Sequence, residues 1–129
     1  MLTLFAFLGV LLLVVMVHEF GHFSIAKLSG VRVLEFGMGF PPRLFGFRRG
    51  ETLYSVNLLP IGGFVRLAGE ENAEEPGGFV GKPVLIRLAI LAAGSLMNIL
   101  LPLLLFIIFF MVPKSVPVTD IVVLQVVGN

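Results

Sequence analysis

Two long apolar runs constrain the fold of this chain more than any other feature. Residues 2–17 contain no charge, and residues 88–112 form a second run of the same character. A helix needs roughly 20 apolar residues to cross the hydrocarbon core of a bilayer. The first run reaches that length when it continues to about Ile25, and the second run is long enough as it stands, with Pro102 expected to kink or loosen it. The sequence therefore predicts two transmembrane helices.

Composition and charge agree with a membrane protein. Of the 129 residues, 57% are hydrophobic and only 13% are charged, whereas a soluble domain carries about 25% charged residues. The net charge of +1 gives no general attraction to nucleic acid, so we expect no nucleic-acid partner. The chain has no cysteine, which excludes disulfides and thiolate metal sites.

The basic residues lie between the two runs and predict the topology. The first is Lys27 and the last is Arg87, with only Lys114 beyond them. Because positive charge marks cytoplasmic loops, the middle segment should be cytoplasmic and both termini should lie outside. A cleaved signal peptide is the alternative for the first run, but Met1 to Thr3 carry no basic side chain and the run lacks a small-residue cleavage site.

The first run ends in His18-Glu19-Phe20-Gly21-His22, the His-Glu-x-x-His pattern of zinc peptidases. On a helix, His18 and His22 share a face, so both imidazoles can reach one Zn²⁺ ion. Glu19 lies beside them as a candidate general base. Either histidine alone would be read as a packing residue, but such a polar set is expensive in lipid and indicates function.

Between the runs, strand-like stretches alternate with turn signals. They fall at residues 31–38, 43–48, 52–59 and 63–67. This pattern predicts up to four short strands in an antiparallel meander. Bends or close backbone approaches are expected at Gly37, Gly39, Gly62 and Gly63. The apolar stretch 58–61 stands at an expected turn tip, and we expect it to dip into the membrane.

The predicted fold is a membrane α+β fold, in which two transmembrane helices are joined by a membrane-associated antiparallel β-meander. The expected parts are a first helix at 1–27, the meander at 28–69, an acidic flexible linker at 70–82, a second helix at 83–112 and an outer-side tail at 113–129. Within the second helix, the amide of Asn98 has two interpretations that spacing leaves equal. It forms an interhelical hydrogen bond, or it donates to a substrate carbonyl or oxyanion.

Taken in order, these motifs resemble the site-2 protease family of intramembrane zinc metalloproteases, especially bacterial members that act in regulated intramembrane proteolysis. The resemblance covers residues 1 to about 112. Its motifs lie at residues 18–23, 36–40, 59–65, 69–70 and 93–98, with Ser95 standing where the family usually has proline.

The resemblance implies a role for each motif. His18 and His22 match the zinc-binding histidines, Glu19 the catalytic glutamate and Asn98 an asparagine that handles substrate. Residues 31–68 match a membrane-associated sheet that guides an unwound substrate by strand addition. The implied partners are the lipid bilayer and a single-pass membrane protein, such as an anti-sigma factor. The implied location is the inner (cytoplasmic) membrane, as a multi-pass protein.

One departure concerns the third zinc ligand, which in the family is an aspartate of a later Leu-Asp-Gly helix. The only aspartate here is Asp120, which does not match that motif. We therefore expect an N-terminal part that is inactive in isolation, and whose tail resembles the start of a PDZ domain. The competing expectations are a catalytically incomplete membrane protein and a module that binds a client helix.

Overall fold

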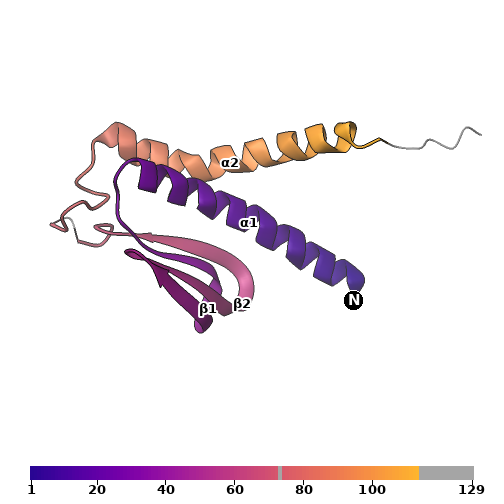
Figure 1. Cartoon of the computed structure of the whole chain (residues 1–129), viewed down its shortest axis with the longest axis horizontal. Coiled ribbons are helices and arrows are strands. Elements are labelled where there is room, and N and C mark those ends of the chain that lie inside the picture. The colour runs from indigo at the N-terminus through magenta and orange to yellow at the C-terminus, as the bar shows by residue number, and fades with distance from the viewer. Residues whose placement is uncertain (73, 114–129) are drawn as a thin grey trace, which may run out of the picture.

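The computed structural model describes residues 1–72 and 74–113 of the chain. In chain order the elements are α1 (Leu2–Leu28), β1 (Val33–Arg49), β2 (Thr52–Leu67) and α2 (Val84–Met111). α1 packs against α2 on one side and against β2 on another (Figure 1). The helices lie close together where α1 ends and α2 begins, and they diverge toward the other end. The predicted site residues therefore lie on two helices that pack together: His18, Glu19 and His22 on α1, and Asn98 on α2.

The two helices coincide with the two apolar runs. Both are long and apolar enough to cross a membrane. Their bounds agree with the predicted 1–27 and 83–112, and α2 continues as helix through Pro102. The possible PDZ start and Asp120 lie outside the described residues.

The sheet consists of two long, bent strands rather than the four short ones that the turn signals predicted. β1 and β2 pair antiparallel over residues 33–40 against 59–67, and over 43–49 against 52–57. A third set of pairs runs parallel, because the residue numbers increase on both strands, from Glu35 with Leu53 to Met38 with Val56. The stretch 33–40 thus lies between two passages of β2. The predicted meander order is wrong in this respect, although its four strand-like stretches all lie in the sheet.

Glycine bends explain why the turn signals did not end the strands. Gly39 and Gly62 have φ of +76° and +100°, which a side chain disfavours. The Leu59 carbonyl oxygen also lies where a Gly39 side chain would be, and the Asn57 amide donates to the Gly39 carbonyl over 3.0 Å. The chain therefore turns inside β1 and β2, and strand pairing resumes beyond each bend. The apolar stretch at 58–61 belongs to β2 and stands where that strand reverses direction, as the turn signals predicted, and Leu58 is half exposed there.

A buried carboxylate joins three passages of the sheet. Glu35 is only 4% exposed. It accepts hydrogen bonds from Arg43 over 2.9 Å, from Ser55 over 2.7 Å and from Arg66 over 3.1 Å. Because these donors come from both strands, from segments that lie before and after the bends, this network stabilises the folded-back shape of the sheet.

A small core lies where the helices and the sheet meet. Its buried members come from all of the elements: Ala26, Val31, Val33, Leu67 and Ile90. The acidic segment after β2 is tied to this end, because Glu70 accepts from the Leu67 amide and Glu75 accepts from the Gly69 amide. The segment expected to be a solvated linker thus uses its carboxylates to hold backbone.

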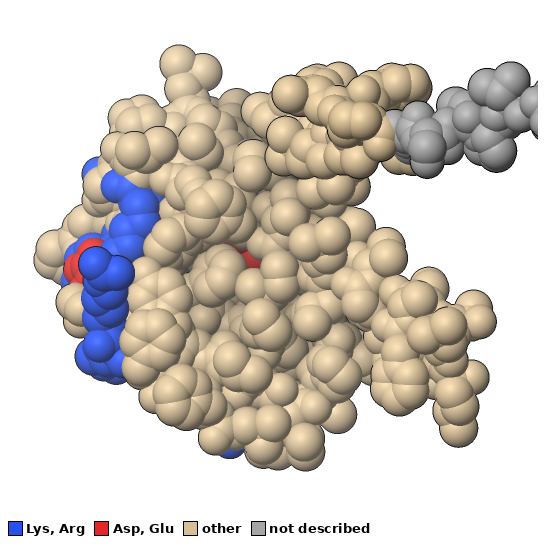
Figure 2. Space-filling view, turned by 45° about the vertical axis from the view of Figure 1, so that its right-hand side comes forward, with Lys and Arg blue, Asp and Glu red and all other residues tan. Residues whose placement is uncertain are grey.

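Charge is unevenly distributed on the surface. Figure 2 shows the basic side chains gathered in a band on one side, while most of the same face carries no charge. Lys27 and Arg32 form ion pairs with Glu51, each over 3.4 Å, so the β1–β2 turn is tied to the end of α1. Most of the large apolar side chains of α1 and α2 are exposed.

Candidate metal centre

His18 and His22 lie one turn apart on α1 and face the same way. Residues 2–28 are continuous helix, and the two imidazole centroids are 4.8 Å apart with their planes at 77°. The prediction that both rings lie on one face of one helix is confirmed. Their role as ligands remains a prediction at this point.

α2 leaves a space for both rings at Gly94. A Cβ atom built on Gly94 would lie 2.5 Å from Nε2 of His22 and 2.6 Å from Nε2 of His18. The helices approach this closely because Gly21 on α1 also has no side chain, and the Ala93 carbonyl occupies the place of its Cβ. Both Nε2 atoms therefore converge on one small volume beside α2.

The other ring nitrogen of each histidine is engaged by α2. Nδ1 of His22 donates to the Ile90 carbonyl oxygen over 2.7 Å. Because a carbonyl only accepts, Nδ1 carries the proton and Nε2 keeps a free lone pair, which is the form that binds a metal. Nδ1 of His18 lies 3.2 Å from Nδ2 of Asn98. The structure thus brings Asn98 of α2 to His18 of α1, a contact that fits the interhelical hydrogen bond, one of the two interpretations that spacing left equal.

Glu19 faces the sheet and not α2. One residue along a helix is a rotation of about 100°, which turns its side chain toward β2. A Cβ atom on Gly63 would lie 3.4 Å from Cγ of Glu19. The backbone N–H of Val65 donates to the Glu19 carboxylate. The histidines and the glutamate are therefore positioned by different neighbours of α1.

The two histidines fit a zinc ion, but they supply only part of a catalytic site. Such sites usually have three protein ligands. Within residues 1–72 and 74–113, no group of three or more His, Cys, Asp and Glu side chains could hold a metal. A third ligand must come from outside the described residues if the site is to be complete.

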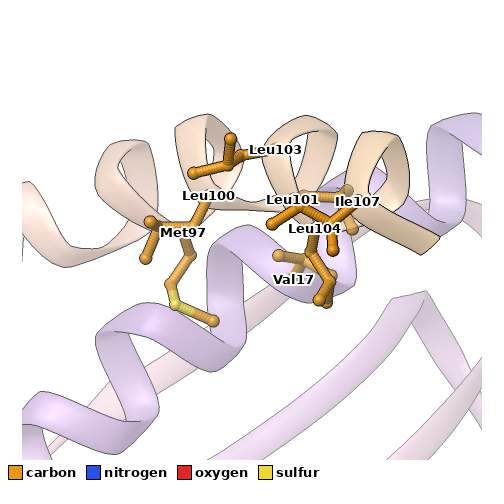
Figure 3. A pocket seen from close by; sticks show the side chains of 7 residues that line it. All are labelled: Val17, Met97, Leu100, Leu101, Leu103, Leu104 and Ile107. Carbon is orange, nitrogen blue, oxygen red and sulfur yellow. The ribbon is translucent and has the colours of Figure 1, made fainter. Parts of the chain in front are cut away.

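Two hollows border the centre. One of about 390 Å³ lies where the helices diverge, and Figure 3 shows Val17 of α1 opposite apolar side chains of α2, among them Met97. These two residues adjoin His18 and Asn98 in the sequence. A second hollow of about 200 Å³ is lined by His22, Val65 and Ile90, among others. Of the two, only the second hollow is lined by a residue of the centre, His22, on the sheet side.

Sequence reasoning missed the residues that support the centre. Ile90 and Val65 act through backbone atoms, so residue type gave no signal, whereas Gly63 was expected to allow a close backbone approach and does so beside Glu19. Gly94 lies in the matched motif at 93–98, but the space that it leaves for the two rings was not predicted. Its spacing of four residues from Asn98 places both on one face of α2, and that signal could have located it.

Comparison with known proteins assigns the family. The sequence matches the family model of peptidase family M50 over residues 6–127. The chain belongs to this family. The resemblance to the site-2 proteases is therefore confirmed.

Three relatives illustrate the similarity. A Clostridium perfringens protein whose name includes the words zinc metalloprotease is 44% identical over 94 residues, which cover 72% of this chain and 28% of the relative. Zinc metalloprotease RasP of Shouchella clausii is 50% identical over 82 residues, which cover 61% of this chain and 20% of RasP. A Thermotoga maritima relative, also named as a zinc metalloprotease, is 43% identical over 106 residues, covering 78% and 21%. The chain thus spans less than a third of each relative.

Proposed function

We propose that this M50 chain supplies two zinc ligands and the general base of an intramembrane zinc metalloendopeptidase. The observation that carries the proposal is the convergence of Nε2 of His18 and of His22 on the space beside Gly94, with Glu19 next to them. The names of the relatives support zinc as the metal. A third ligand, from outside the described residues, completes the site.

Each residue has a defined task in peptide hydrolysis. When bound, zinc would polarise the scissile carbonyl and make water a better nucleophile at neutral pH. Glu19 takes a proton from the attacking water and passes it to the leaving amine. The N–H of Val65 holds the carboxylate toward the sheet, so the base keeps one orientation. His18 and His22 hold the metal.

The substrate we propose is a transmembrane segment of a single-pass protein, such as an anti-sigma factor. The apolar groove beside Val17 and Met97 suits a segment that arrives from lipid. The β2 stretch 59–67 pairs with β1 on one side. Its other side adjoins Glu19 at Val65, so an unwound substrate added as a strand there would lie beside the base.

We place the protein in the inner membrane as a multi-pass protein, with residues between Lys27 and Arg87 in the cytoplasm. The band of basic side chains supports this orientation. A cysteine at Glu74 should react with a membrane-impermeant reagent only from the cytoplasmic side. Labelling from the outer side would overturn the topology.

The function is tested by supplying the rest of the protease. Co-expression with the remaining C-terminal part of a relative such as RasP should raise the zinc content to about one per chain and allow cleavage of a model transmembrane substrate. The chain alone should bind zinc weakly and cleave nothing, since two protein ligands leave the site open to water. Glu19→Gln in the complemented enzyme should lower cleavage by about 10²–10⁴-fold and leave zinc bound.

A second candidate is a catalytically incomplete membrane protein that binds a client helix. It is favoured by the absence of a third ligand from residues 1–72 and 74–113. Binding of the model substrate without cleavage, even in the complemented protein, would favour this candidate over the protease.

A further inference from the structure

We propose that Asn98 is a positioning residue for His18, with its Oδ1 accepting a hydrogen bond from Nδ1–H of that histidine when metal is bound. This inference rests on the proposed function and gives Asn98 a task other than contact with substrate.

The Asn98 amide is only half satisfied. Nδ2 lies 3.2 Å from Nδ1 of His18, while Oδ1 is buried and has no hydrogen-bond partner among the described residues. A buried acceptor without a partner costs free energy. The orientation of the amide therefore has room to respond to the state of His18.

Metal binding fixes that state. Nε2 of His18 faces the space at Gly94, and it can bind a metal only through its lone pair. The proton of the neutral ring must then lie on Nδ1. With Nδ2 opposite, two donors would face each other. A carboxamide has almost the same shape after a half turn, so turning brings Oδ1 to Nδ1–H and makes a hydrogen bond at no steric cost.

The same arrangement already exists at the other ligand. Nδ1–H of His22 donates to the Ile90 carbonyl oxygen over 2.7 Å. Ile90, Gly94 and Asn98 follow at intervals of four residues, so they share one face of α2. Once the Asn98 amide has turned, this face would present the Ile90 carbonyl, the space at Gly94 and the Asn98 Oδ1 to the two rings of α1. Each ligand is thereby held in its metal-binding tautomer, an effect known to support metal affinity.

Two substitutions separate this task from others. Asn98→Asp keeps an acceptor and loses the NH₂ donor, while Asn98→Leu keeps the size and loses both. Ser95→Ala, an exposed hydroxyl change on the same helix, is the matched control. The probe is Co²⁺ bound in detergent to the chain co-expressed with the C-terminal part of RasP, and its visible absorption reports binding.

We expect Asn98→Leu to weaken Co²⁺ binding by about 10–100-fold. Asn98→Asp should bind at least as tightly as the wild type, and Ser95→Ala should match the wild type. In ¹⁵N NMR spectra of the metal-loaded chain, the Nδ1 proton of His18 should be protected from exchange in the wild type and in Asn98→Asp. This protection of the Nδ1 proton should be lost in Asn98→Leu, a change that a purely structural role of Asn98 would not produce.

The outcomes also distinguish this proposal from the metal centre itself. If Asn98→Asp binds as weakly as Asn98→Leu, the NH₂ group matters and the acceptor role is wrong. If Asn98→Leu binds like the wild type while His18→Ala abolishes binding, only the role of Asn98 fails. If His18→Ala leaves Co²⁺ binding unchanged, both this inference and the proposed metal centre are overturned.

Discussion

The face of α1 that packs on α2 and the face that packs on β2 position their polar groups by different means. Toward α2, Gly94 has no side chain, and Nε2 of His18 and of His22 lie in the space that this leaves. Toward β2, Gly63 lets the strand approach and the backbone N–H of Val65 reaches Glu19. Under the proposed function, metal binding and proton transfer would depend on separate neighbours, although their residues are adjacent in the sequence. A substitution on one face of α1 should therefore abolish metal binding or proton transfer without affecting the other.

The largest expected effect is on the α2 face. Gly94→Ala should lower metal affinity more than 100-fold, because the new Cβ would occupy the space of both Nε2 atoms. Alanine is the better helix former by about 1 kcal/mol, so lost helix stability would not explain the result. Zinc content after dialysis against a chelator series measures the effect.

Gly9→Ala is the control for this substitution. Gly9 lies on α1, and nothing comes within 4 Å of a Cβ built there. It should leave zinc binding unchanged. Wild-type affinity in Gly94→Ala would show that the rings can move aside, and that α2 does not shape the metal site.

The second effect is on the sheet and should leave the α2 face intact. Glu35→Ala removes the acceptor shared by Ser55, Arg43 and Arg66. The arginines are about half exposed and stay solvated, so we expect a loss of about 1–3 kcal/mol in the free energy of unfolding, mainly from the buried hydroxyl. Denaturant unfolding of the detergent-solubilised chain measures it.

Exposed Glu71→Ala, outside this network, should change stability by less than about 0.5 kcal/mol. Metal affinity should be unchanged in Glu35→Ala. A parallel loss of stability and zinc would mean that the sheet also supports the histidines, which would break the separation of the two faces.

The sequence was sufficient for the helices and for the shared face of His18 and His22. Local spacing and hydropathy determine both, so no distant contact was needed. The path of the sheet was not predictable in the same way. The position of residues 33–40 between two passages of β2 depends on Glu35 meeting Arg66, far along the chain, and on bends that keep pairing through Gly39 and Gly62.

The centre shows the same limit. A glycine in a membrane helix fits general close packing as well as a specific space, so the role of Gly94 required the positions of both rings. The two interpretations of Asn98 were equal for a similar reason, because only the packed helices bring its amide to Nδ1 of His18.

The smallest effect should come from Gly63, and it tests the sheet face alone. A Cβ there would lie 3.1 Å from the Gly37 carbonyl oxygen, 3.3 Å from Sδ of Met16 and 3.4 Å from Cγ of Glu19. These contacts are tight but can be relieved by a shift of a few tenths of an ångström. In the complemented enzyme, Gly63→Ala should therefore lower cleavage about tenfold, since small misplacements of a reacting group are costly. Zinc content should stay at the wild-type value. Gly81→Ala is the control, because its Cβ would meet only the Gly78 carbonyl oxygen at an ordinary 3.6 Å. Reduced zinc content in Gly63→Ala would show that displacing Glu19 also displaces the neighbouring ligands, and the two faces of α1 would then have to be treated as one site.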